Sequence, residues 1–96
     1  MRAGEILGEK RTEILRIAAM HGARNVRVFG SVARGEEGEG SDVDLLVEIE
    51  KGRSILDLGS LQMDLQEMLG VPVDVVEEGG LRPSLRERIL SEAVSL

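Results

Sequence analysis

Three aspartates, Asp42, Asp44 and Asp74, are placed so that a fold could gather them into one site for divalent cations. Asp42 and Asp44 are two residues apart in a run typical of a β-strand, so their side chains point to the same face of a sheet. Asp74 lies in a second strand-like run, residues 71–76. Carboxylates on apolar strands are costly unless their charge is compensated. A divalent cation is the simplest compensation, and a phosphate substrate is the usual reason to hold one.

A glycine and a serine that follow an earlier strand-like run are candidates for phosphate binding. Gly30 and Ser31 come directly after the β-branched run 25–29. A glycine at a strand end lets the backbone come close to a ligand. A helical turn that starts there presents free N–H groups to an anion. Arg34 follows closely and has three open interpretations: it pairs with phosphate, it pairs with one of the aspartates, or it lies in solvent.

Each of these features has a plainer explanation when taken alone. Gly-Ser is a common turn, an Asp-x-Asp pair can be the polar face of an edge strand, and Asp74 can face solvent from a half-exposed strand. The combination is harder to explain in this way. Ten residues separate Ser31 from Asp42, and a helix joins the Asp-x-Asp strand to the strand that carries Asp74.

The elements that must position these residues follow from the spacing of hydrophobic side chains. Apolar residues three, four and seven apart predict helices, and short β-branched runs predict strands. A flexible acidic loop is expected at 35–40. The pattern indicates an α+β fold, with a small mixed β-sheet and helices packed on one face, in a single domain of residues 1–96. The predicted order is helix, strand, helical turn, strand, helix, strand, helix, over residues 5–20, 25–29, 32–35, 42–50, 54–69, 71–77 and 84–94.

Local signals mark the ends of the long middle helix. Ser54 is its expected N-cap, and Asp57 three residues later makes a variant of the capping box. Gly70 is expected to end the helix. In the last predicted helix, Leu85 and Ile89 are expected to face inward.

Composition excludes several classes of function. The 96 residues contain no cysteine, which excludes disulfides, thiolate metal sites and cysteine nucleophiles. The net charge of −6 argues against broad binding to nucleic-acid backbone. No apolar run approaches the roughly 20 residues of a membrane span, and the first residues lack the apolar stretch of a signal peptide. We therefore expect a soluble, cytoplasmic protein with no membrane contact.

Two sequence segments together resemble a known signature. The chain is similar to the DNA polymerase beta-like nucleotidyltransferase superfamily, and more narrowly to the minimal nucleotidyltransferases of bacteria and archaea. Those proteins are the antitoxin partners of HEPN-domain toxins. The resemblance covers nearly the whole chain. Its motifs are Gly30-Ser31-Val32-Ala33-Arg34-Gly35 and Ser41-Asp42-Val43-Asp44-Leu45.

The resemblance implies a fold, a reaction and a role for each candidate residue. Gly30 and Ser31 would hold the triphosphate of a nucleotide, with Arg34 as a further phosphate contact. Two Mg²⁺ ions would be bound by three catalytic carboxylates, corresponding here to Asp42, Asp44 and Asp74. The implied reaction transfers AMP from ATP to a tyrosine hydroxyl of the partner HEPN toxin.

Two other functions remain open at this stage. The chain could be a non-catalytic nucleotide-binding module that neutralises a toxin by direct binding. It could also transfer a nucleotide to a small molecule, although the small size argues against this because no second domain is expected to enclose such an acceptor.

Overall fold

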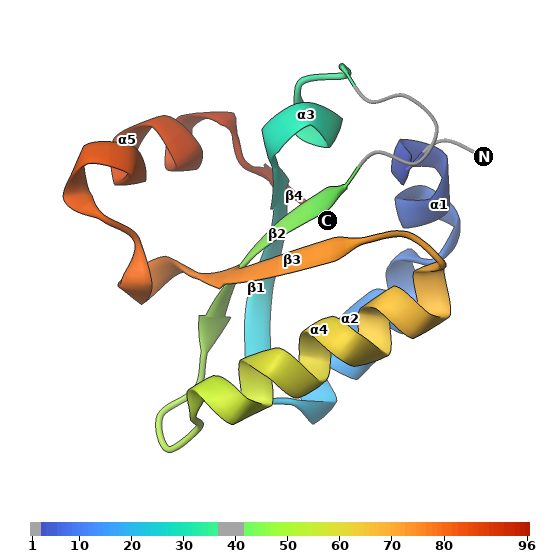
Figure 1. Ribbon diagram of the computed structural model, residues 1–96, viewed down its shortest axis with the longest axis horizontal. Helices are drawn as coiled ribbons and strands as arrows, with labels where there is room; N and C mark the ends of the chain where they lie inside the picture. Colours follow the sequence, from blue (N-terminus) through green and yellow to red (C-terminus); the bar gives the residue numbers. More distant parts are fainter. Residues whose placement is uncertain (1–2, 37–41) are drawn as a thin grey trace.

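The sheet at the centre of the molecule has four strands in the part of the chain that the structure describes. The computed structural model describes residues 3–36 and 42–96, so most of the expected acidic loop at 35–40 lies outside the described residues. β2 runs parallel to β3, whereas β1 is antiparallel to both β2 and β4. The predicted mixed sheet is confirmed (Figure 1). Its strands, in the spatial order β3-β2-β1-β4, are β1 (Ala23–Phe29), β2 (Val43–Ile49), β3 (Val73–Glu77) and β4 (Val94–Ser95).

The helices cover the two faces of the sheet unequally. On one face α2 contacts β1, α4 contacts β3, and the two helices contact each other. α5 lies over the opposite face and reaches α3 at its C-terminal end (Figure 1). The helices are α1 (Ala3–Glu9), α2 (Arg11–Met20), α3 (Gly30–Ala33), α4 (Ile55–Leu69) and α5 (Pro83–Glu92), and a 3-10 turn, η1 (Glu78–Gly80), precedes α5.

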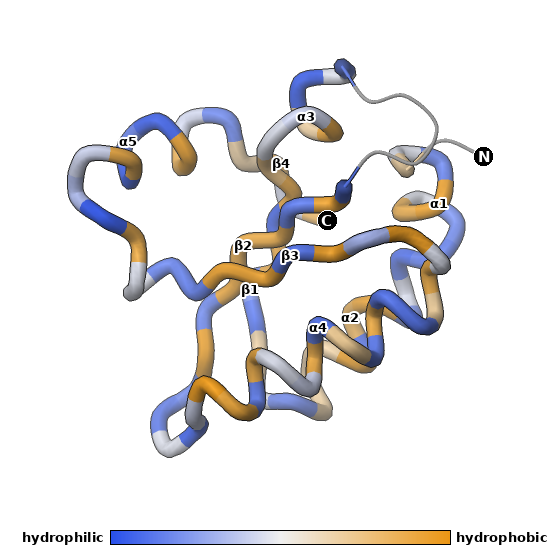
Figure 2. The backbone as a smooth tube through the Cα atoms, in the orientation of Figure 1, coloured by the Kyte–Doolittle hydropathy of each residue, from blue (hydrophilic) through white to orange (hydrophobic). Residues whose placement is uncertain are grey.

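Strand alternation places Asp44 on the face of the sheet opposite the main hydrophobic cluster. In β2, the side chains of Val43, Leu45 and Val47 are almost completely buried in the main hydrophobic cluster. That cluster also contains the inward residues of α2 and α4, such as Ile14 and Leu65. Because side chains alternate along a strand, the residue between Val43 and Leu45 points to the other face. Figure 2 shows the mostly hydrophobic strands between helices whose outer turns are hydrophilic.

The predicted ends of the long middle helix are confirmed in α4. The Ser54 hydroxyl accepts a hydrogen bond from Leu56 N at 3.2 Å, and Ser54 N donates to the Asp57 carboxylate at 2.8 Å. These reciprocal bonds form a capping box. At the other end Gly70 adopts φ 71°, a left-handed conformation that favours glycine, and its N–H bonds to the Gln66 carbonyl.

Ser54→Ala is expected to reduce the free energy of unfolding by about 1 kcal/mol, because it removes the acceptor for an otherwise unpaired N–H at the helix start. Thermal unfolding would show this as a fall in Tm of roughly 4–8 °C for a domain of this size. Ser60→Ala on the exposed side of the same helix is the control and should leave Tm almost unchanged. Equal shifts in the two variants would contradict the capping role.

The first and last predicted helices were wrong in their extent. The expected helix over 5–20 is divided at Lys10 into α1 and α2, although hydrogen bonds continue across the break from Lys10 N to Ile6 and from Ile14 N to Lys10. The division lets α1 contact α3 while α2 contacts β1 and α4. The expected helix over 84–94 ends at Glu92, because the following residues pair with the free edge of β1 as β4.

Candidate active site

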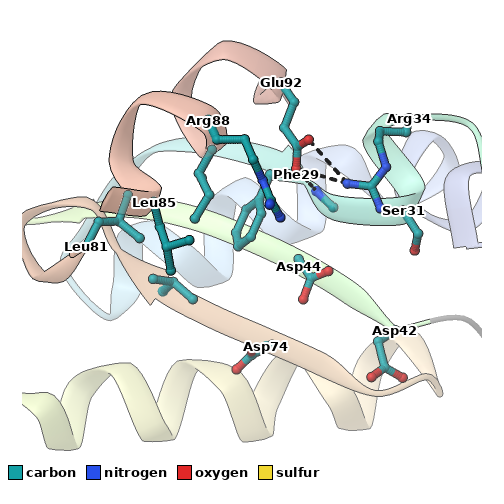
Figure 3. A pocket seen from close by; sticks show the side chains of 13 residues that line it. Phe29, Ser31, Arg34, Asp42, Asp44, Asp74, Leu81, Leu85, Arg88 and Glu92 are labelled. Atoms are coloured by element: carbon teal, nitrogen blue, oxygen red, sulfur yellow. Dashed lines mark hydrogen bonds and ion pairs between the residues drawn. The ribbon is translucent and has the colours of Figure 1, made fainter. Parts of the chain in front are cut away.

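The register of the two parallel strands sets Asp44 and Asp74 side by side. Asp44 in β2 is the direct partner of Asp74 in β3. Neighbouring strands lie about 4.8 Å apart, so the two side chains stand next to each other on the same face. Asp42, just before β2, lies at the same end of the sheet (Figure 3). The Asp-x-Asp segment and Asp74, which lies 30 residues after Asp44, therefore bring their carboxylates to the same end of the sheet.

These carboxylates open into a pocket of about 690 Å³ between the sheet, α3 and α5. All six residues predicted for the site lie on its wall, and their chemical roles stay predictions. One end of the pocket is polar and the other is apolar (Figure 3). The lining residues are Phe29, Gly30, Ser31, Arg34, Asp42, Asp44, Asp74, Val76, Leu81, Leu85, Arg88, Ile89 and Glu92.

The pKa of Asp44 is raised above its usual value. Burial of the carboxylate is the largest cause, followed by repulsion from Asp74 and then Asp42, with a partly offsetting attraction to Arg34. Asp44 is half-buried, whereas Asp42 and Asp74 are exposed. The site therefore carries more negative charge than its surroundings compensate.

The donor set suits Mg²⁺, which prefers carboxylate oxygens, phosphate oxygens and water. The three aspartates supply such oxygens. Burial is the largest cause of the raised pKa of Asp44, and repulsion from Asp74 and Asp42 adds to it, so a bound cation would offset part of the shift. Among residues 3–36 and 42–96, however, no three acidic, histidine or cysteine side chains are already close enough together to hold a metal ion. To share one ion, the three aspartate side chains would have to turn toward each other.

Gly30 is the point where the backbone approaches the Asp44 carboxylate. Gly30 has φ 76°, a conformation that L side chains rarely adopt. A Cβ atom added there would overlap the Asp44 carboxylate oxygen. Both the turn and the close approach therefore require glycine. The predicted turn at Gly30-Ser31 is confirmed, and α3 begins within it.

Arg34 lies on the pocket wall but is already paired with two glutamates. Its Nε donates to Glu36 at 2.7 Å, and its Nη1 donates to the Glu92 carboxylate at 3.2 and 3.3 Å (Figure 3). Of the three interpretations open from sequence, pairing with an aspartate is therefore not what the structure shows. Arg34 still lowers the pKa of Asp44 through its charge.

A comparison with protein families decides the class. The family described as the nucleotidyltransferase domain matches residues 11–96, which include every residue of the pocket wall. The chain belongs to the nucleotidyltransferase family.

The relatives of this nucleotidyltransferase are protein adenylyltransferases, and the chain is an enzyme of that group. It is 43% identical to a protein described as a protein adenylyltransferase of Methanocaldococcus jannaschii, over 94% of this chain and 97% of the relative. It is 41% identical to the protein adenylyltransferase MntA of Thermococcus cleftensis, over 76% of this chain and 74% of the relative.

Solved structures share the fold of this nucleotidyltransferase. One described as a minimal nucleotidyltransferase is 54% identical, covers 97% of this chain and 95% of its own, and has a TM-score of 0.87. A toxin–antitoxin structure with AMP-PNP shows the same fold at 19% identity, with a TM-score of 0.76 over 88% of this chain and 69% of its own. The recognised resemblance and the predicted α+β nucleotidyltransferase fold are thereby confirmed. In that fold α5 lies on the face opposite α2 and α4, whereas the sequence pattern predicted helices on one face (Figure 1). Among the described residues, no helix is both long enough and apolar enough to cross a bilayer.

Sequence reasoning missed the residues that α5 and the turn before it add to the nucleotidyltransferase pocket. Glu92 and Arg88 line its polar side, and Leu81 and Leu85 its apolar end. Leu85 was expected to face inward but is 41% exposed, whereas Ile89 is buried as expected. The four-residue spacing of Arg88 and Glu92 was visible in the sequence, but the face of the sheet that α5 covers was not.

Proposed function

We propose that this nucleotidyltransferase, acting as a single domain, is an antitoxin that transfers AMP from ATP to a hydroxyl of a partner HEPN-class toxin. A tyrosine hydroxyl is the proposed acceptor. The observation that carries the proposal is the pairing of Asp44 with Asp74 beside the Gly30 turn. This arrangement provides carboxylates for metal ions and backbone for phosphate within one pocket.

The proposed division of labour follows from the position of each side chain. Asp42, Asp44 and Asp74 would hold two Mg²⁺ ions, which when bound supply charge stabilisation at the transferring phosphate. Asp74 would also take the proton of an incoming hydroxyl, the role that the family resemblance implies for it, and its exposed side chain on β3 is open to such an acceptor. Gly30, Ser31 and Arg34 would bind the triphosphate.

The partner is proposed on chemical and evolutionary grounds. The pocket is open, and its apolar end at Leu81 and Leu85 can accept the ring of an aromatic side chain beside the carboxylates. A solved toxin–antitoxin complex with AMP-PNP shares the fold. The MntA relative, at 41% identity, is a protein adenylyltransferase by name.

The test is incubation of the protein with a HEPN-class toxin, Mg²⁺ and ATP labelled either at the α- or at the γ-phosphate. Transfer of AMP predicts that the toxin gains label from α-labelled ATP only, because pyrophosphate leaves with the γ-phosphate. One molecule of antitoxin should then modify many molecules of toxin. Label from γ-labelled ATP would instead identify phosphorylation. Neutralisation only at equal amounts and without label would favour the non-catalytic binding module.

Metal binding is expected to weaken on acidification. The loss should begin at a higher pH than it would in a site whose aspartates have ordinary pKa values. A protonated Asp44 cannot bind a cation, and its pKa is raised, so affinity should fall about tenfold per pH unit once the pH drops below that pKa. Titration of Mn²⁺ by paramagnetic resonance, from neutral pH downward, measures this. Asp74→Asn removes one source of repulsion and should move the transition to lower pH. A transition in the ordinary aspartate range in the unsubstituted protein would contradict the prediction.

A further inference from the structure

The carboxylate of Glu92 occupies two of the donors that the proposed function assigns to phosphate. Its Oε1 accepts a hydrogen bond from Gly30 N at 3.0 Å. Both of its oxygens lie within 3.3 Å of the Arg34 guanidinium (Figure 3). An N–H at a glycine turn and a guanidinium that converge on one oxygen pair form an anion site, and here an internal carboxylate fills it.

Glu92 is charged in this position. Its side chain is 19% exposed, so it is largely withdrawn from water. The hydrogen bond from Gly30 lowers the pKa of Glu92, as do the hydrogen bond and the charge of Arg34. Arg88, on the preceding turn of α5, lowers it further. The site thus holds an anion at neutral pH without any ligand.

A polyphosphate that approached Gly30 would meet a negative charge on the donors it needs. Both anions cannot use the same N–H, and two like charges at this separation repel. Either the polyphosphate binds elsewhere in the pocket, with Glu92 left as a brace for Arg34, or Glu92 releases its donors. Gly30 N and the Arg34 guanidinium are both donors that the proposed function assigns to the polyphosphate, and Glu92 uses both of them, which favours release.

We propose that Glu92 is a built-in competitor of the nucleotide, which must leave Gly30 N and Arg34 before the polyphosphate can bind. This inference rests on the proposed function, because it assumes a polyphosphate ligand. Competition lowers the apparent affinity to the intrinsic affinity multiplied by the fraction of molecules in which the donors are free. The end of α5 therefore sets the affinity of a site whose other parts come from α3 and from strands β2 and β3.

Glu92→Gln removes the charge but keeps the size of the side chain, and it is expected to bind ATP about 10-fold more tightly. Hydrogen bonds to charged groups are stronger than hydrogen bonds to neutral groups, and the difference in free energy corresponds to roughly this factor in affinity. Isothermal titration with ATP and Mg²⁺ measures the change. The affinity for inorganic tripolyphosphate should rise by a similar factor, and the affinity for adenosine should not change. Glu87→Gln, an exposed residue outside the pocket on the same helix, is the matched control and should bind ATP as the unsubstituted protein does.

Two further variants keep the test decisive. Glu92→Asp retains the charge but shortens the side chain, so the carboxylate should reach Gly30 N and Arg34 less well and ATP should bind more tightly. This variant replaces the test if Glu92→Gln folds poorly. In an Arg34→Ala background the gain from Glu92→Gln should shrink, because one of the contested donors is gone. Unchanged or weaker ATP binding by folded Glu92→Gln would overturn the inference and identify Glu92 as a brace. Failure of the unsubstituted protein and every variant to bind ATP would overturn the proposed function as well.

Discussion

Asp44→Asn should abolish AMP transfer and at the same time stabilise the protein in the absence of nucleotide. Asp44 lies at the centre of the carboxylate site, between Asp42 and its strand partner Asp74. Asparagine keeps the shape but removes the charge that a divalent cation requires. Loss of one preorganised charged group in an active site lowers kcat by on the order of 10²–10³-fold. Transfer of label to the toxin should therefore fall at least that far.

The gain in stability follows from the sign of the pKa shift. The pKa of Asp44 is raised in the folded state, so the folded protein holds this proton more tightly than the unfolded chain does. The favourable contribution of Asp44 is present at low pH and is lost as pH rises through the raised pKa. At neutral pH the ionised carboxylate opposes folding, and asparagine removes this effect. Tm of Asp44→Asn should therefore exceed that of the unsubstituted protein at neutral pH, and the difference should shrink on acidification.

Thermal unfolding with and without Mg²⁺ and ATP checks both parts of this prediction. Ligands should raise Tm of the unsubstituted protein but not that of Asp44→Asn. Glu67→Gln on the exposed side of α4 is the control for loss of one negative charge, and it should keep full transfer activity. If Asp44→Asn were less stable than the unsubstituted protein, or if it still labelled the toxin, Asp44 would not be the destabilising, metal-binding carboxylate of the reaction.

Gly30→Ala is the second substitution with a large expected effect. The left-handed φ of 76° alone costs an L residue about 1–2 kcal/mol. In addition, the new Cβ would overlap the Asp44 carboxylate, so the turn or the aspartate must move. A displacement of about 1 Å in a catalytic site can reduce the rate on the order of 10²-fold. We expect loss of AMP transfer together with a lower Tm.

Gly70→Ala separates the cost of backbone strain from the effect of overlap with the Asp44 carboxylate. Gly70 has nearly the same backbone angle, φ 71°, but a Cβ there would meet no atom within 4 Å. It ends α4 and takes no part in the pocket wall. Gly70→Ala should lower stability by a similar backbone cost while AMP transfer survives below Tm. If both variants lose activity to the same extent, the contact between Gly30 and Asp44 is not the cause.

The local features of the fold could be predicted because each depends on neighbours in sequence. The capping box at Ser54 and the glycine stop at Gly70 involve residues within a single helix. The alternation of Val43, Asp44 and Leu45 already separates a core face from a polar face, whatever the strand order. The failures were the break at Lys10 within the first predicted helix and the early end of the last one. Contact of α1 with α3 and pairing of β4 with the edge of β1 decided these outcomes.

The sequence by itself determined the candidate site residues and their local conformations: a Gly-Ser turn, an Asp-x-Asp strand and a third aspartate on a later strand. Only the tertiary structure decided that β2 and β3 are parallel and in register, which sets Asp44 against Asp74. It also decided that α5 covers the polar face, which brings Glu92 to Gly30 over 62 residues of chain. Strand register and helix placement depend on contacts between distant segments, and short-range patterns carry no information about them.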